Sequence, residues 1–567
     1  MNIFKKNIKY ITIIASFLLQ NISADIIRDL EIDKIFTTID TTKTSYGKKQ
    51  LHTILTHPTN NIEILTQRQT LIQECANNSQ LSDALQRELS TFNTYEPALH
   101  KLFQPTDSVK DAALEQFYFA SSFCKKFNTH PALLECGLIG HLANLMGSTI
   151  QHTLTLIILT KYLDDHTCHA GCSHEHGIIE SFTKNIKQIF NNKKPKKKRI
   201  KSAVQTWHVL AQIQELYAVQ SIIRNELSVI RHLQEQLVAL ANGIHSIKNI
   251  HTLLQNAPHI TNNLSLYSHI HNLCTKSNIS DKLQQLLTLL EKPTFKSASF
   301  FSRIGNILAA YKLVNDINKE LIPAFHAMGE IDAYVSCAQL LDNNNDTTMQ
   351  YTYAQYQKPQ NGPSIDAHDF WHPLATNTPQ PNTLILSNEN NTRNIIITGP
   401  NACGKSTTLK NLTLCAYLAQ TITLVPAKHY SQTIFKEIYS SINITDDIQN
   451  NASLFVTELH NAEELLNTIE MLQPNEYIFI ALDELFTSTH HTKGQTVAYN
   501  LLKNIYTSPQ VVSVVTTHFE ELTKLSQDNR YCCTNYTVKN FTVMPGIGKP
   551  DISFDIIKKE HISRLLE

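Results

Sequence analysis

The sequence contains a glycine-bounded turn followed by a lysine and a hydroxyl residue. Residues 395–410 read IIITGPNACGKSTTLK, with Gly399 after an apolar run and Gly404-Lys405-Ser406 closing the motif. The spacing G-x-x-x-x-G-K-[ST] between a strand and a helix is typical of phosphate-binding loops, and this context argues against a chance glycine turn. Backbone N–H groups cradle phosphates, the lysine neutralises the β- and γ-phosphates, and the serine hydroxyl holds Mg²⁺. We expect the phosphates of a nucleotide to bind Gly399, Pro400, Asn401, Ala402, Cys403, Gly404, Lys405, Ser406 and Thr407.

Two further apolar runs end in residues that can complete such a site. Tyr477–Leu482 is followed by Asp483 and Glu484, and Val511–Thr516 is followed by Thr517-His518. A carboxylate at a strand end holds Mg²⁺ together with Ser406, and a second carboxylate can polarise the attacking water. We assign the metal role to Asp483 and the catalytic role to Glu484. A lone histidine is more often an ordinary surface residue, but after two matched motifs we favour a catalytic role for His518 at the γ-phosphate or its water.

These side chains meet only if the three runs form neighbouring strands. Ile395–Thr398, Tyr477–Leu482 and Val511–Thr516 are short, apolar and β-branched, as buried strands of a parallel sheet are. From Asn382 onward such runs alternate with helical patterns, which predicts an α/β domain over 382–567 with a mostly parallel sheet. Residues 351–381 are rich in Pro, Asn, Gln and Thr, which indicates either a linker or the entry into that domain.

The first part of the chain is predicted to be helical. Leu233–Ala241 and Lys282–Leu290 place leucines three and four positions apart, the spacing of an amphipathic helix. Only 15 glycines among 567 residues also favour long helices with few tight turns. A length of 567 residues exceeds one ordinary domain. We therefore expect a helical domain over 25–350 and a second domain over 382–567.

The overall charge points to no particular partner. Lys plus Arg and Asp plus Glu both number 49, so any contact with DNA must rest on local patches. One such patch is the basic run 193–201, KKPKKKRIK. Pro195 within it argues against a continuous helix. A solvated loop and a tip that contacts DNA phosphates remain equally open interpretations.

The cysteines are spread along the chain, and one short stretch also contains several histidines. The 11 cysteines are scattered and odd in number, which favours reduced thiols over a disulfide framework. Cys168, Cys172, His174 and His176 could together ligate zinc. Their spacing matches no common zinc finger, so we favour a polar loop and keep metal binding as the alternative.

The N-terminus has the layout of a secretory signal. Lysines at positions 5, 6 and 9 precede the apolar run Ile11–Leu19, and Ala24 ends a candidate cleavage site. The apolar run is too short for a good membrane-spanning helix. A signal peptide over 1–24, a membrane anchor within 5–24 and an ordinary first helix all remain open. Because ATP and reduced thiols belong to the cytoplasm, we expect a cytoplasmic protein. Tethering of the protein to the membrane by this segment remains open.

The motifs of the second domain resemble those of the MutS family of DNA mismatch-repair ATPases. The resemblance is carried by Gly399-Pro400-Asn401 within the phosphate loop, by Asp483-Glu484 and by Thr517-His518. The stretch 446–459, DDIQNNASLFVTEL, is similar to the family's signature segment. In that family the serine of this segment, here Ser453, reaches the nucleotide of the partner subunit. The resemblance thus implies a homodimer through the ATPase domains.

Three upstream stretches extend the resemblance, more loosely, to the helical part. They are Thr44–Pro58 together with Arg68, Glu330–Ser336, and His372-Pro373. The implied fold class is an α+β multidomain protein, with a long helical lever and clamp domain followed by a P-loop α/β ATPase domain. The implied activity is DNA-dependent hydrolysis of ATP with Mg²⁺, in which the helical clamp holds DNA. The basic run 193–201 is a candidate for a second contact with DNA.

The sequence also departs from the family. The resemblance begins near residue 27, which leaves no room for mismatch-reading and connector domains, so we expect matched and mismatched duplexes to bind alike. A role in repair or recombination without mismatch reading follows. After Glu484 the family's glycine-rich continuation is replaced, and Lys493 stands where repair members carry an acidic residue. The alternative function is a membrane-tethered ATP-binding scaffold that has lost DNA binding. A transport ATPase is less favoured, because no Leu-Ser-Gly-Gly-type signature is present.

Overall fold

The computed structural model divides the chain into two compact units. Unit 1 comprises residues 1–90, 250–268 and 325–567, and unit 2 comprises residues 91–249 and 269–324. The structure describes residues 26–104, 114–167, 187, 196–296, 303–342, 349–359, 362–375, 379–442 and 454–548.

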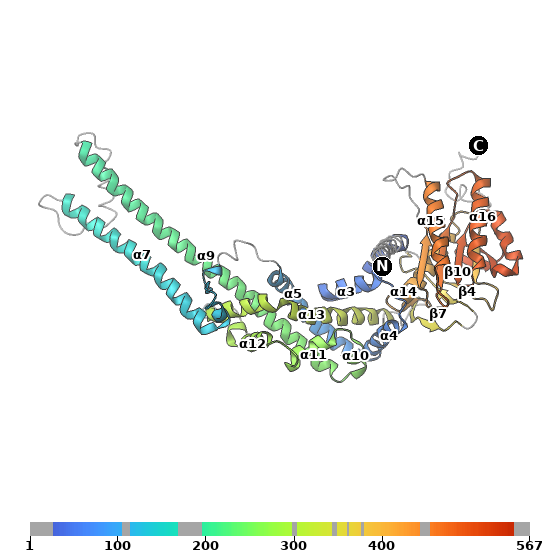
Figure 1. Cartoon of the computed structure of the whole chain (residues 1–567), viewed down its shortest axis with the longest axis horizontal. Helices are drawn as coiled ribbons and strands as arrows, with labels where there is room; N and C mark the ends of the chain where they lie inside the picture. The colour runs from blue at the N-terminus through green and yellow to red at the C-terminus, as the bar shows by residue number, and fades with distance from the viewer. Residues whose placement is uncertain are drawn as a thin grey trace, which may run out of the picture. The chain divides into compact units, whose positions relative to one another are not determined.

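Helices account for most of the first 342 residues, as the leucine spacing predicted (Figure 1). They are α2 (Ile32–Ile39), α3 (Ser45–Thr56), α4 (Ile62–Asn77), α5 (Ser79–Phe103), α7 (Pro131–Thr167), α9 (Lys196–Leu254), α10 (Pro258–Asn263), α11 (Tyr267–Thr275), α12 (Asp281–Leu290) and α13 (Ile304–Asp342), with short 3₁₀ helices at Lys125–Thr129 and Pro293–Phe295. The predicted segments Leu233–Ala241 and Lys282–Leu290 lie in α9 and α12, so both helix predictions are confirmed. Within the described residues, no helix combines the length and the apolarity needed to cross a membrane.

Strands begin after residue 350 and form three sheets in unit 1. They are β1 (Tyr351–Tyr353), β2 (Gln355–Gln357), β3 (Ile365–Phe370), β4 (Asn382–Leu386), β5 (Asn394–Thr398), β6 (Leu424–Pro426), β7 (His429–Thr433), β8 (Glu437–Ser441), β9 (Ile478–Asp483), β10 (Val511–Thr516), β11 (Cys533–Lys539) and β12 (Thr542–Pro545). The sheets have the orders β1-β6, β2-β7-β3-β4 and β12-β11-β5-β10-β9-β8. The segment 351–381, expected as a linker or the entry into the second domain, contributes β1, β2 and β3 to two of these sheets.

The six-stranded sheet is mostly parallel, and its helices are α14 (Lys405–Ala419), α15 (Leu454–Glu470) and α16 (His491–Thr507), with 3₁₀ helices at Glu520–Gln527 and Asn529–Tyr531 (Figure 1). Only the edge pair β11 and β12 is antiparallel. The three predicted strands are β5, β9 and β10, and they lie next to one another in parallel, which confirms that prediction. Their central residues are fully buried because helices cover the sheet.

The strand register fixes which residues leave the sheet together. Thr516 of β10 pairs with Asp483 of β9 on one side and with Ile397 of β5 on the other. These three residues therefore lie in one row at the carboxyl ends of their strands. The chain segments that follow, which begin at Thr398, Glu484 and Thr517, leave from the same sheet edge.

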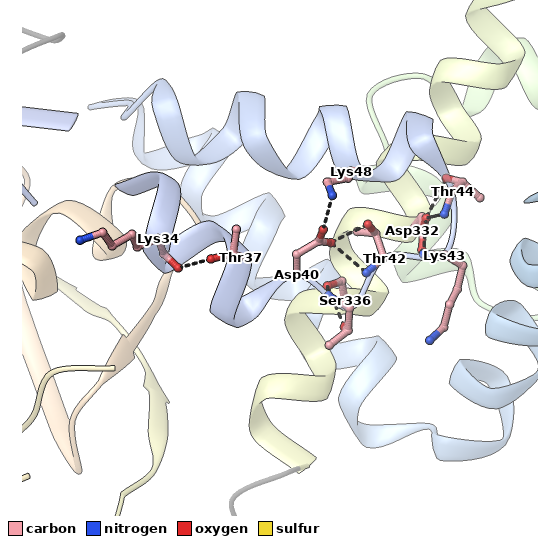
Figure 2. Close-up of polar contacts among 10 residues, drawn as sticks. Lys34, Thr37, Asp40, Thr42, Lys43, Thr44, Lys48, Asp332 and Ser336 are labelled. Atoms are coloured by element: carbon pink, nitrogen blue, oxygen red, sulfur yellow. Dashed lines mark hydrogen bonds and ion pairs between the residues drawn. The ribbon is translucent and has the colours of Figure 1, made fainter. Parts of the chain in front are cut away.

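A buried carboxylate of α13 holds the start of α3 in unit 1 (Figure 2). Asp332 is 1% exposed and accepts hydrogen bonds from Lys43 N (3.0 Å), Thr44 N (2.8 Å) and Thr44 Oγ1 (2.7 Å). Burial raises the pKa of Asp332, while these bonds oppose that rise. A Cβ atom at Gly47 would lie 2.1 Å from Asp332 Oδ2, so only glycine fits there. Two of the upstream stretches that carry the resemblance thus meet at one contact.

The carboxyl end of α14 is fastened to the helices near the N-terminus. Arg68 of α4 donates from Nη1 to the carbonyl of Thr421 at 2.6 Å. Gln420 accepts from Thr59 N at 2.9 Å and donates from Nε2 to Thr59 O at 3.3 Å. A guanidinium at a helix C-terminus satisfies free carbonyls and complements the helix dipole. The helix that starts at the phosphate loop is therefore joined to α4 within unit 1.

Unit 2 is built from long helices around leucine contacts. Leu233, Leu237 and Leu240 of α9 are buried, as are Leu283 and Leu286 of α12. The side chains of the basic run lie outside the described residues, although α9 itself begins at Lys196, directly after Pro195.

Candidate functional site

The phosphate loop connects β5 to α14 and depends on two glycines. Gly399 has φ 146° and Gly404 has φ 107°, in the left-handed region that favours glycine. A Cβ atom at Gly404 would lie 2.6 Å from Cδ1 of Phe541, so the neighbouring hairpin also requires glycine there. The left-handed Gly404 is the N-cap residue of α14, and the first helical residue is Lys405. The N-terminal N–H groups of α14 thus face the space above the sheet edge.

Lys405 is folded back onto its own loop. Its side chain is 4% exposed, and Nζ donates to the carbonyls of Gly399 and Pro400, both at 3.1 Å. Nζ also lies 3.2 Å from His518 Nε2 and 3.5 Å from Glu484 Oε1. An ammonium group that bridges loop carbonyls and a carboxylate can exchange the carboxylate for phosphate oxygens without leaving its pocket.

Ser406 and Asp483 form the pair expected to hold a metal ion. Ser406 Oγ donates to Asp483 Oδ1 at 3.1 Å, and Thr516 Oγ1 donates to the same oxygen. Burial raises the pKa of Asp483, while the bonds from Thr516 and Ser406 oppose that rise. A hydroxyl and a carboxylate oxygen side by side at a sheet edge are hard oxygen ligands of the kind that Mg²⁺ prefers, so this donor set fits the ion.

Glu484 and His518 are in direct contact. His518 Nε2 lies 2.8 Å from Glu484 Oε1, and this contact is the largest cause that lowers the pKa of Glu484. The backbone at Glu484 is left-handed, with φ 48°, and Glu484 N donates to Thr516 O at 3.1 Å. The strained turn directs the carboxylate toward Lys405 and His518 instead of along the strand. The parallel register therefore brings together Lys405, Ser406, Asp483, Glu484 and His518, as the sequence predicted from three separate motifs.

The structure adds a pocket that sequence reasoning missed. A pocket of about 390 Å³ opens beside the start of α14. It is lined by His372, Ala375, Pro379, Gln380, Asn382, Thr407, Thr408, Asn411, Asn540 and Phe541. Of these residues, only Thr407 and His372 belong to motifs that were singled out in the sequence. Phe541 N donates to Cys403 O at 3.0 Å, which ties the β11–β12 hairpin to the phosphate loop. A pocket next to the phosphate site is where a nucleotide base would lie.

The Phe541→Ala variant is expected to bind ATP about 5- to 150-fold more weakly, because stacking of a base on an aromatic ring contributes about 1–3 kcal/mol. Phe541 lines the pocket, and its side chain is 49% exposed. Inorganic triphosphate, which has no base, should bind this variant as it binds the wild type. Calorimetric titration with both ligands measures the difference. Equal losses for the two ligands would show that Phe541 supports the loop and does not contact the base.

Three sequence predictions lie outside the described residues. The first is Ser453, expected to act on the partner subunit's nucleotide, and the second is the group of Cys168, Cys172, His174 and His176. The third is the signal-like pattern within residues 1–25. Among the residues that the structure describes, no group of three or more His, Cys, Asp or Glu side chains could hold a metal ion.

Comparison with known proteins places this site in a family. Residues 395–547 match the family described as MutS domain V. The chain is 24% identical over 511 residues to MutS protein homolog 4 of Mus musculus, which covers 87% of this chain and 49% of that protein. It is 26% identical over 278 residues to DNA mismatch repair protein MutS of Fervidobacterium nodosum, which covers 47% of this chain and 30% of that protein. The chain spans about half the length of the MutS protein homolog 4 sequences that it matches.

Proposed function

We propose that this chain, which belongs to the MutS family, is a Mg²⁺-dependent ATPase whose turnover switches a DNA-binding dimer. The observation that carries the proposal is the meeting of Lys405, Glu484 and His518 at one sheet edge, within 3.5 Å of one another. Ser406 and Asp483 lie at the same edge with a contact of 3.1 Å. A P-loop ATPase needs a phosphate-binding lysine, a metal-binding pair and a group that activates water, and this edge supplies one of each.

The roles of the side chains follow from their contacts. The N–H groups of the phosphate loop and Lys405 would bind the β- and γ-phosphates, and Ser406 and Asp483 would hold Mg²⁺. When bound, Mg²⁺ neutralises negative charge on the phosphate oxygens. As Lys405 binds phosphate, it releases Glu484 from the ion pair seen in the structure. Nucleotide binding would therefore also prepare the general base.

Hydrolysis then requires an ionised Glu484. The pKa of Glu484 is lowered, chiefly by its contact with His518, and the ionised carboxylate can accept a proton from the attacking water. The water oxygen bonds to the γ-phosphorus while the bond from that phosphorus to the bridging oxygen of ADP breaks. His518 Nε2 lies within hydrogen-bonding distance of the Glu484 carboxylate, where it would donate a hydrogen bond and orient that carboxylate.

A route for the nucleotide signal runs along α14. This helix begins at the phosphate loop, and its far end is bound to Arg68 and Thr59. A shift of α14 on nucleotide binding would displace α4, which belongs to the helical part that the resemblance assigns to the lever. The expected outcome is an affinity for DNA that depends on the bound nucleotide. Homodimer formation with Ser453 acting in trans remains a sequence-based part of the proposal.

The ATPase and its DNA dependence can be tested together. ATP hydrolysis is measured without DNA and with homoduplex, mismatched duplex and four-way junction DNA, and DNA binding is measured across a salt series. We expect turnover to change on addition of at least one DNA and binding to weaken steeply with salt, because phosphate contacts release counterions. Hydrolysis with no DNA binding at low salt would instead favour the scaffold alternative, whose membrane tether would lie within residues outside the described part.

The basic run offers a defined variant for the same assay. The double variant Lys196→Gln/Lys197→Gln should lower the slope of log K against log salt by about 0.9 for each DNA phosphate that the protein no longer neutralises. A matched control is Lys428→Gln/Lys524→Gln, because these two lysine side chains are 75% and 57% exposed on unit 1. An unchanged slope of log K against log salt in Lys196→Gln/Lys197→Gln would show that the basic run is a solvated segment that does not contact DNA.

A further inference from the structure

A buried glutamate of α15 binds the chain segment that follows Glu484. Glu458 is 6% exposed, and its two carboxylate oxygens each accept one hydrogen bond. Oε1 accepts from Phe486 N at 2.9 Å, and Oε2 accepts from Ser488 Oγ at 2.7 Å. Hydrogen bonds to an ionised acceptor are shorter and stronger than those between neutral groups. Glu458 therefore fixes a short loop from a helix that lies 28 residues away in sequence.

The bound segment has a strained backbone. Glu484 has φ 48° and Phe486 has φ 57°, and neither residue is a glycine. Such conformations persist only where the surroundings hold them. On the strand side, Thr516 accepts the N–H of Glu484 at 3.1 Å. After the turn, Phe486 has no β-sheet partner among the described residues. Its N–H group instead donates to the carboxylate of Glu458.

Packing of the same loop agrees with this role of Glu458. The ring of Phe486 is fully buried and meets Phe455 of α15 edge to face, with ring centroids 6.0 Å apart. At Gly494 of α16, a Cβ atom would lie 2.3 Å from the carbonyl oxygen of Phe486. The loop is thus held between α15 and α16, and Glu458 is the charged contact in that arrangement.

We propose that Glu458 is a positioning residue for ATP hydrolysis, which holds the left-handed turn after β9 so that the carboxylate of Glu484 faces the phosphate site. The inference rests on the proposed ATPase function. The carboxylate of Glu458 accepts its hydrogen bonds from Phe486 and Ser488, in the segment after Glu484, so its loss should change the rate of the chemical step and leave nucleotide binding intact.

The test compares three variants in steady-state ATP hydrolysis, ADP binding and thermal unfolding. For Glu458→Ala we expect kcat to fall by about 10²-fold, because a misplacement of about 1 Å at a catalytic group can cost that much. The dissociation constant for ADP should stay within about twofold, the usual margin for independent sites. Glu458→Gln should recover most of the rate, since its amide oxygen still accepts from Phe486 N and its NH₂ group can donate to Ser488 Oγ. Glu464→Ala, on the exposed face of α15, is the matched control and should behave as the wild type.

A double-mutant cycle separates positioning from a purely structural role. In the Glu484→Gln background, Glu458→Ala should slow single-turnover hydrolysis by no more than about twofold, because the group that it positions is already absent. Losses that multiply in the double variant, or a weaker affinity for ADP that matches the loss in kcat, would overturn the proposal. Unchanged kcat in Glu458→Ala would also overturn it.

Two further measurements keep the outcomes distinct. If Glu458→Ala does not fold, Ser488→Ala is a smaller change that removes one of the two hydrogen bonds to Glu458. The Ser488→Ala protein should have a lower kcat and an unchanged affinity for ADP. An unchanged kcat would count against the proposal. Absence of ATP hydrolysis by the wild-type protein would refute the proposed function itself. That result differs from hydrolysis by the wild type with no effect of Glu458→Ala, which would refute only the role of Glu458.

Discussion

The Lys405→Ala protein is expected to lose measurable ATP and ADP binding, with an affinity at least about 10²-fold below that of the wild type. The side chain is almost fully buried and its ammonium group would contact two phosphates, and charge-assisted hydrogen bonds of this kind contribute about 1.5–3 kcal/mol each. Calorimetric titration measures the loss directly. Lys405→Met, which keeps the volume of the side chain, should show the same loss and separates it from a cavity effect.

Lys410→Ala is the matched control for this prediction. Lys410 lies on the same helix, but its ammonium group lies 3.9 Å from Glu31. The Lys410→Ala protein should therefore bind nucleotide with the affinity of the wild type. Nucleotide binding by Lys405→Ala at wild-type affinity would remove the phosphate-binding role from this lysine.

The Lys405→Ala variant can also test whether two chains together complete one ATP-hydrolysing site. Lys405→Ala and Ser453→Ala proteins should each be nearly inactive alone. In mixed dimers one site would combine an intact phosphate loop with an intact serine from the other chain, and part of the activity should return. No recovery, with exchange of subunits demonstrated, would remove the trans role from Ser453.

The second large effect is expected at Glu484. Glu484→Gln should bind ATP normally but hydrolyse it about 10²- to 10⁴-fold more slowly, because general-base catalysis contributes about that factor. Glutamine keeps the size of the side chain and one acceptor oxygen, so the contact with His518 can persist. A rapid filter-binding assay should find ATP retained on the variant, and single-turnover hydrolysis gives the rate.

Glu521→Gln provides the control for charge alone. Glu521 is 40% exposed and pairs only with Lys524 among the ion pairs of the described residues, so its substitution should leave turnover unchanged. Equal turnover in Glu484→Gln and the wild type would assign the activation of water to another group.

Much of the site could be predicted because it depends on local patterns. Glycine spacing identified the loop at Gly399–Ser406, and apolar runs of about four to six residues identified the strands. In a parallel sheet the carboxyl ends of strands share one edge, so Asp483-Glu484 and His518 could be placed there before any coordinates were known. The periodicity of leucines likewise sufficed for α9 and α12.

Short strands were not predictable in the same way. β1 and β2 have three residues each, in a stretch whose composition indicates a linker. They are strands because β6 and β7, more than 70 residues later, provide their hydrogen-bond partners. Strand formation of this kind depends on the partner and leaves little trace in the strand's own sequence.

The sequence by itself determined which residues we propose for the chemistry, namely the phosphate loop, Ser406 with Asp483, and Glu484, because each is encoded by residue type and spacing along one segment. Only the tertiary structure decided what surrounds them. The approach of Phe541 to Gly404, the hydrogen bonds from Phe486 and Ser488 to Glu458, and the attachment of α14 to Arg68 join segments 28 to 353 residues apart. Such contacts arise from the packing of strands and helices in three dimensions, which no local periodicity encodes.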